Sequence, residues 1–126
     1  MENLLTKSRE HLNAANILHQ TKCYSSVPHC SYYACFQLFI YIMSMDQSFE
    51  GKDSHNKLIN LVEDEVYRRD NEDYSALDFN NDITKLKKER SLADYKTKIF
   101  YDRESRKNIN VATRLTANLA NIFNIK

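Results

Sequence analysis

The scarcity of glycine and proline constrains the fold of this chain more than any other feature. One glycine, Gly51, and one proline, Pro28, occur in 126 residues. Tight β-turns and the phosphate-binding loops of Rossmann-type folds depend on glycine. A helical bundle with short polar connections needs few residues of either kind, so the sequence predicts an all-α fold. The length fits a single domain, residues 1–126, which can bury a core without disulfides or metals.

Apolar residues recur at steps of three and four in five segments, which predicts five helices. The expected helices span residues 3–21, 28–45, 54–69, 74–93 and 103–124. Residues 22–27 and 47–53 lack the pattern and are expected to be a turn and a loop. Pro28 suits the first turn of the second helix, and Asp53 or Ser54 can cap the third.

The second predicted helix is apolar in nearly every direction around its axis. A helix of that kind is either central in its domain or packs against a second surface. In so small a protein, we expect one face to pack inside and another to meet a partner chain. The sequence therefore predicts a homodimer.

No segment of the sequence reads as a signal peptide or a membrane span. The first residues lack a basic stretch followed by an apolar run, and the run from Tyr32 to Met45 is too short and too polar to cross a bilayer. Three cysteines, an odd number, indicate free thiols in a reducing compartment. We therefore expect a cytoplasmic protein that does not contact membranes.

A zinc site is the alternative function for the cysteines. The residues available for it are Cys23, His29, Cys30 and Cys35. No Cys-x-x-Cys pair occurs among them, and the spacing departs from the usual pattern of zinc ligands. We therefore expect no metal and no other cofactor.

Charge is unevenly distributed along the chain. Residues 63–82 carry two basic and eight acidic groups, whereas residues 83–126 carry eleven basic and four acidic groups. Most of the positive charge lies between Lys85 and Lys107, beside Tyr95, Phe100 and Tyr101. Such a surface can bind phosphates and stack a base. The alternative is a solvated helix end whose cations balance the acidic block.

Arg90 is the most informative single residue, because it lies in register with the apolar stripe of the fourth predicted helix. A buried arginine must be paired or must serve a site. Asp94 follows at i+4, which is the spacing of an intrahelical ion pair. Arg90 is therefore either one partner of a structural salt bridge or a phosphate ligand beside Tyr95, and the spacing by itself favours the salt bridge.

The histidines divide into two groups. His55 lies where the third helix begins, so it can act as an acid, as a base or as a contact to a bound anion, although a capping or packing role is more common there. His11, His19 and His29 have no acidic or nucleophilic neighbours at suggestive spacing and are interpreted as structural or solvent-facing. Among the aromatic residues, Tyr32 and Tyr33 open the apolar second helix, and a buried tyrosine hydroxyl needs a partner.

Several of these patterns occur together in an order that resembles the HEPN family, the nucleotide-binding domains of higher eukaryotes and prokaryotes. The two most specific are Tyr-Tyr-Ala at residues 32–34 and Arg-x-x-Ala-Asp-Tyr at residues 90–95. Leu12 to Leu18, Tyr24-Ser25-Ser26 and Ser54-His55 add to the resemblance, which covers about residues 2–96. It implies an antiparallel, up-and-down four-helix bundle with an added C-terminal helix, often dimeric. Many relatives act with a nucleotidyltransferase partner, in toxin–antitoxin or substrate-binding pairs.

Other members of the family are metal-independent endoribonucleases with an arginine followed four to six residues later by a histidine. Here Arg90 matches the arginine, but Tyr95, Lys96 and Thr97 fill the window of the histidine. The resemblance therefore favours a nucleotide- or RNA-binding module over a catalyst. The expected binding residues are Arg90, Tyr95, Lys96, Lys98 and Tyr33.

Two alternatives to the binding module remain. The first is an endoribonuclease with a degenerate motif, in which Arg90, Asp94 and His55 would be the catalytic residues. Such an enzyme needs a general base, a general acid and a group that stabilises developing charge. The second alternative is a structural scaffold without a ligand.

Overall fold

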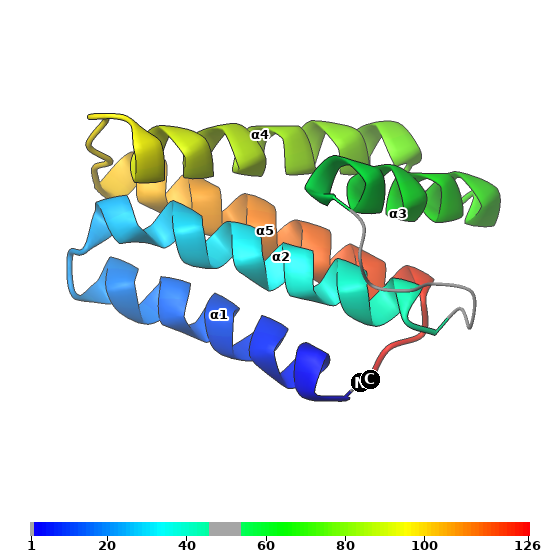
Figure 1. The fold of residues 1–126 in the computed structure, drawn as a ribbon. Coiled ribbons are helices and arrows are strands. Elements are labelled where there is room, and N and C mark those ends of the chain that lie inside the picture. Colours follow the sequence, from blue (N-terminus) through cyan, green and yellow to red (C-terminus); the bar gives the residue numbers. More distant parts are fainter. Residues whose placement is uncertain (1, 46–53) are drawn as a thin grey trace.

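The structure is a computed structural model that describes residues 2–45 and 54–126. It contains α1 (Glu2–Gln20), the 3-10 turn η1 (Tyr24–Ser26), α2 (Val27–Met43), α3 (His55–Arg69), α4 (Ala76–Tyr95) and α5 (Asp102–Ile122) (Figure 1). These ranges contain no strand, so the all-α prediction is confirmed. The predicted helix boundaries agree within two residues at every end. The loop predicted at residues 47–53 lies outside the described residues.

Side chains at the helix starts account for where α3 and α4 begin. The Ser54 hydroxyl accepts a hydrogen bond from the Lys57 backbone N–H at 3.2 Å. Ser75 and Asp78 form a reciprocal capping box, in which each side chain accepts from the other residue's backbone N–H at 3.1 and 3.0 Å. Ser54 therefore caps α3 as one of the two expected residues, while Asp53 lies outside the described residues.

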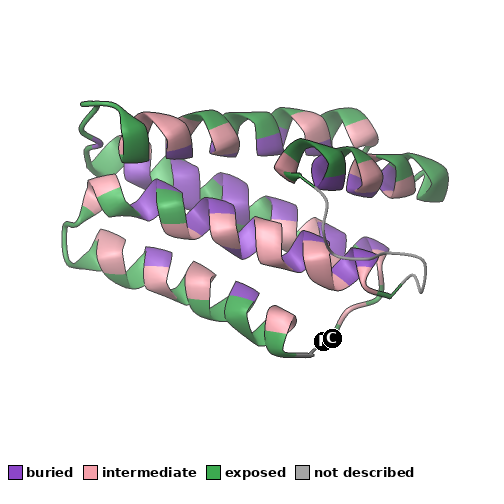
Figure 2. Ribbon diagram, in the orientation of Figure 1, coloured by how far each residue is buried: buried purple, intermediate pink, exposed green. Residues whose placement is uncertain are grey.

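The helix α2 lies at the centre of the fold and contacts α1, α3, α4 and α5. Its buried residues include Tyr32, Leu38 and Phe39, and the last two join a core shared with every other helix. Figure 2 shows α2 largely in the colours of buried and half-buried residues. Of the two alternatives for a helix that is apolar all round, the structure shows the central position, and the face expected to meet a partner chain stays a prediction. None of the helices in residues 2–45 and 54–126 has the length and apolar character needed to cross a bilayer.

The other helices surround α2 along its length. In Figure 1 the chain direction reverses from α1 to α2 and again from α4 to α5, so the two termini lie together at one end. The last helix, α5, contacts α1, α2 and α4. The shorter α3 packs against α2 and α4, and its first residue, His55, lies over the N-terminal half of α2 through its contact with Tyr32.

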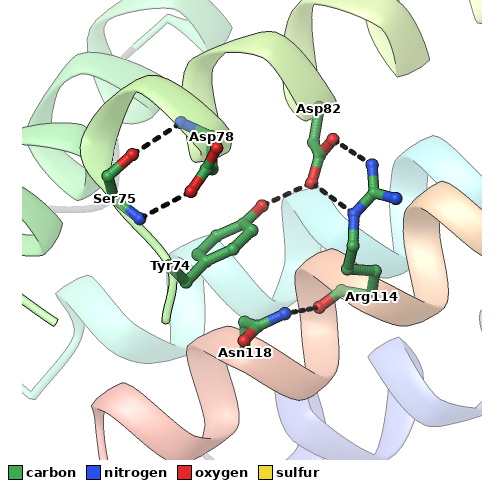
Figure 3. Close-up of polar contacts among 6 residues, drawn as sticks. All are labelled: Tyr74, Ser75, Asp78, Asp82, Arg114 and Asn118. Atoms are coloured by element: carbon green, nitrogen blue, oxygen red, sulfur yellow. Dashed lines mark hydrogen bonds and ion pairs between the residues drawn. The ribbon is translucent and has the colours of Figure 1, made fainter. Parts of the chain in front are cut away.

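A buried carboxylate fastens α4 to α5 (Figure 3). Asp82 on α4 is 7% exposed and accepts two hydrogen bonds from the Arg114 guanidinium on α5, at 3.2 and 2.5 Å. The Tyr74 hydroxyl donates a third at 2.7 Å. Burial and this bond to Asp82 raise the pKa of Tyr74 above its ordinary value, so the phenol stays a neutral donor. A bidentate pair of a guanidinium and a carboxylate is among the stronger polar contacts available to a protein.

Replacing Arg114 with methionine should destabilise the fold, because the Asp82 carboxylate would keep only the Tyr74 hydroxyl as a partner. We expect a loss of about 1–3 kcal/mol in the free energy of unfolding, measured by urea denaturation. The control is Arg106→Met, which breaks the exposed pair with Asp102 and should cost about 0.5 kcal/mol or less. Equal losses in the two variants would contradict the structural role of Asp82.

Candidate functional site

Arg90 is buried among three tyrosine rings near the C-terminal end of α4. The residue is 8% exposed and continues the buried stripe of Phe79, Ile83 and Leu86. Its guanidinium carbon lies 4.9 Å from the ring centre of Tyr32, 5.6 Å from that of Tyr33 and 5.5 Å from that of Tyr95. Aromatic faces attract a cation at these distances. The rings hold the guanidinium in place without neutralising its charge.

The hydrogen bonds of Arg90 leave part of its guanidinium unused. Nη1 donates to the Tyr95 hydroxyl at 3.3 Å and lies 4.0 Å from the Asp94 Oδ2 atom. Nε is buried and has no hydrogen-bond partner within the described ranges. A separation of 4.0 Å is too long for a hydrogen bond. The ion pair expected from the spacing is therefore present, but without a hydrogen bond between the two side chains.

Asp94 makes its short contact with His29 instead. The His29 Nδ1 atom lies 2.8 Å from the Asp94 Oδ2 atom, and the His29 side chain is half exposed. The interpretation of His29 as structural or solvent-facing was therefore incomplete, because it has an acidic partner 65 positions away in the chain. Local spacing could not reveal a contact between α2 and α4.

The same aromatic cluster connects Arg90 to His55 at the start of α3. The Tyr32 hydroxyl and the His55 Nδ1 atom share a hydrogen bond of 2.9 Å. The imidazole also lies against the Phe36 ring, with 4.0 Å between ring centres. Burial, the charge of Arg90 and the charge of Lys87 lower the pKa of His55 below its ordinary value. The imidazole is therefore held neutral.

Tyr32 is a neutral hydrogen-bond donor in this network. Burial raises its pKa to about 12, and this effect exceeds the opposing influence of Arg90. If its hydroxyl donates to Nδ1, the neutral imidazole of His55 carries its own proton on Nε2. In that tautomer the Nε2–H is a hydrogen-bond donor, and in the other tautomer Nδ1 donates to the Tyr32 oxygen and Nε2 can accept a proton.

Most of the predicted site residues come together around Arg90. Asp94 and Tyr95 contact it directly, Tyr33 lies beneath its guanidinium, and His55 is linked through the Tyr32 ring. Tyr33 also connects the two histidines, with ring-centre distances of 4.8 Å to His29 and 6.2 Å to His55. Tyr95 is 70% exposed, so one face of the cluster is open to solvent.

The predicted lysines are less closely tied to this cluster. Lys96 is exposed and ends α4 as its C-cap residue. Lys98 pairs with Glu104 at 3.3 Å and lies over the Phe100 ring. Phe100 itself is only 2% exposed, so it is unavailable to stack on a base. Of the aromatic residues expected beside the basic region, Tyr95 and Tyr101 are the exposed ones.

Part of the basic region is balanced by its own neighbours. Arg106 pairs with Asp102 and Lys98 with Glu104, all within residues 98–106. The bridge between the acidic block and the basic half of the chain is Arg114 to Asp82. The sequence offered the alternative that residues 63–82 neutralise the cations of the basic region. That neutralisation is seen for Arg114, which lies outside residues 85–107.

The cysteines are free thiols: Cys23 is exposed, Cys30 half-buried and Cys35 buried. Over residues 2–45 and 54–126, no three side chains from histidine, cysteine, aspartate or glutamate are grouped so that they could hold a metal ion.

Comparisons of the chain with protein-family models, with curated proteins and with solved structures found no match.

The lowered pKa of His55 predicts a pH-dependent contribution to stability. In the unfolded chain this histidine takes up a proton below about pH 6.5, whereas the folded protein resists that protonation. Its contribution is therefore fully present above that pH and is lost as the pH falls below it. Urea denaturation of wild type and His55→Gln at several pH values should show wild type losing more stability on acidification.

His11→Gln is the control for this measurement, because His11 lies on α1 and its Nδ1 atom shares a local hydrogen bond with the Lys7 carbonyl one turn earlier. Its pH dependence should follow that of wild type. A His55→Gln profile parallel to wild type would show that His55 protonates equally in the folded and unfolded states.

Proposed function

We propose that this protein is a HEPN-like module that binds the phosphate of a nucleotide or of RNA at Arg90. One observation carries the proposal: Arg90 is a buried cation whose nearest carboxylate in the described residues is 4.0 Å away and already bonded to His29. Leaving a buried charge without a close counterion is costly. A phosphate bound against the guanidinium would supply the missing anion through charge-assisted hydrogen bonds.

The surroundings of Arg90 support a nucleotide rather than a free phosphate. Tyr95 is 70% exposed and its ring lies beside the guanidinium, so it can stack on a base while Arg90 holds the phosphate. Tyr33 is half-buried at the same cluster. Lys96 is exposed at the end of α4 and adds positive charge close to Tyr95 in the chain. Lys98 is a weaker contributor because Glu104 pairs with it.

Replacing Arg90 with glutamine should weaken RNA binding by about tenfold or more, because a charge-assisted hydrogen bond is lost. The measurement is fluorescence anisotropy with a labelled single-stranded RNA, with circular dichroism to confirm folding. Arg106→Gln is the matched control, since it removes an exposed cation paired with Asp102. Equal affinity of wild type and Arg90→Gln would exclude Arg90 as the phosphate ligand.

A second candidate function, metal-independent RNA cleavage, is favoured by the His29–Asp94 contact. The nuclease motif lacks its histidine after Arg90, but His29 reaches Asp94 from another helix at 2.8 Å. A carboxylate that orients an imidazole is a common arrangement for a general base. Arg90, which also approaches Asp94, would stabilise the negative charge that develops on the non-bridging phosphate oxygens. His55 is the second imidazole of the cluster, and its lowered pKa suits a proton acceptor or a neutral hydrogen-bonding group better than a general acid.

RNA cleavage in EDTA tests this candidate. If the protein is a nuclease, His29→Asn should lower the rate by about 100-fold or more, because a general base is removed. His11→Asn, on α1, is the matched control and should cleave like wild type. Cleavage that persists in a folded Arg90→Gln variant would point to a contaminating nuclease. No cleavage by wild type would leave binding as the function.

The resemblance to the HEPN family extends the proposal to architecture and partners. We infer an up-and-down four-helix bundle with an added helix, a homodimer and a nucleotidyltransferase partner, with which the chain would form a toxin–antitoxin-like or substrate-binding pair. The half-buried apolar residues Tyr33, Phe36 and Ile40 on α2 support a second copy at that face. Light scattering measures the dimer, and co-purification with a nucleotidyltransferase encoded beside the gene tests the partner. A folded monomer with no partner and no ligand would favour a scaffold.

A further inference from the structure

A second polar site lies next to the Arg90 cluster, in a groove between α3 and α4. The groove has a volume of about 530 Å³, which is within the range of pockets that hold small organic ligands. Its floor is formed by the apolar side chains of Ile59 and Ile83, which are 7% and 1% exposed. No step of the proposed chemistry at Arg90 uses these residues.

The walls of the groove carry groups that can pair with the edge of a nucleobase. Asn56 and Asn60 project from α3, and Asn80 lines the groove from α4. An asparagine amide offers both donors and an acceptor, which matches the mixed donors and acceptors of base edges. An apolar floor beneath a few polar groups suits a flat aromatic ligand with a polar rim.

The two ends of the groove differ in charge, with lysines at one end and a glutamate beside the other. Lys87 and Lys88 lie at the end near the start of α3, where Lys87 donates a hydrogen bond to the Asn56 side-chain oxygen. At the other end, Asn80 donates to Glu63 at 2.6 Å. A phosphate is therefore favoured at the lysine end, and the base is favoured toward Asn60 and Asn80.

The lysine end of the groove adjoins the Arg90 cluster. Asn56 follows His55 directly, and Ser91, another lining residue, follows Arg90. Lys87 precedes Arg90 by three residues, a rise of about 4.5 Å along a helix. Lys87 and Arg90 are both close enough to His55 to influence its charge. Two cations on one helix thus flank the first residue of α3.

We propose that the α3–α4 groove binds the nucleotide that follows the one held at Arg90, so that the site takes single-stranded RNA of at least two nucleotides. Lys87 and Lys88 hold its phosphate, while Asn56 and Asn60 contact its base above the apolar floor. This inference rests on the proposed function, because it extends the same strand from Arg90 into the groove. The ligand is therefore a polynucleotide rather than a mononucleotide.

The test compares the binding of AMP and of labelled oligoadenylate by wild type, Asn60→Trp and Lys88→Gln. Asn60 and Lys88 are exposed, so both variants are expected to fold. Asn60→Trp fills the groove, and Lys88→Gln removes a phosphate contact. Each should weaken oligoadenylate binding by about tenfold and leave AMP binding unchanged, because a lost base contact or a lost charge-assisted phosphate contact is on that scale.

Two matched controls make the same chemical changes outside the groove. Asn110→Trp places the same bulk on the exposed face of α5, and Lys85→Gln removes an exposed charge from α4. Both should bind oligoadenylate like wild type. Unchanged oligoadenylate binding by Asn60→Trp and Lys88→Gln, with binding lost in Arg90→Gln, overturns the groove and keeps the proposed function. Absence of binding by wild type overturns both.

Discussion

The central position of α2 among the other helices is the constraint on which the rest of the structure depends. Because its side chains are apolar in nearly every direction, the other four α-helices must cover it, and α2 contacts each of them. The burial of Phe39 and Leu38 secures its C-terminal half in the main core. Its N-terminal half carries Tyr32, which packs beneath Arg90 of α4 and bonds to His55 of α3. The candidate site is therefore part of the same packing that holds the helices together.

That packing leaves a buried cation with an incomplete set of partners. The tyrosine rings hold the Arg90 guanidinium in place, but the Asp94 carboxylate is bonded to His29, and Nε has no partner in the part of the chain described. The contrast with Asp82 is informative, because that buried carboxylate receives hydrogen bonds from both Arg114 and Tyr74. The Asp82 carboxylate is fully hydrogen-bonded, whereas the Arg90 guanidinium keeps one buried N–H without a partner among the described residues. Such an imbalance is more typical of a ligand site than of a structural ion pair.

The distribution of charge connects the Arg90 cluster to the α3–α4 groove. The cations near the connection between α4 and α5 are partly paired with their own neighbours, as in Arg106 with Asp102. Lys87, by contrast, bonds to a neutral amide on α3 and keeps its charge available. The cations Arg90 and Lys87 therefore lie together where α4 passes the start of α3. A polyanion following that path would meet Tyr95, Arg90 and Lys87 in turn.

The sequence by itself determined the helices, because its glycine and proline content and apolar periodicity are local properties that act over a few residues. The burial of Arg90 and the capping role of Ser54 followed from the same local patterns. Only the tertiary structure decided that His29 would reach Asp94 and that a groove would form between α3 and α4. Periodicity shows which face of a helix turns inward but not which helix it meets, and contacts between distant residues depend on how all the helices pack at once.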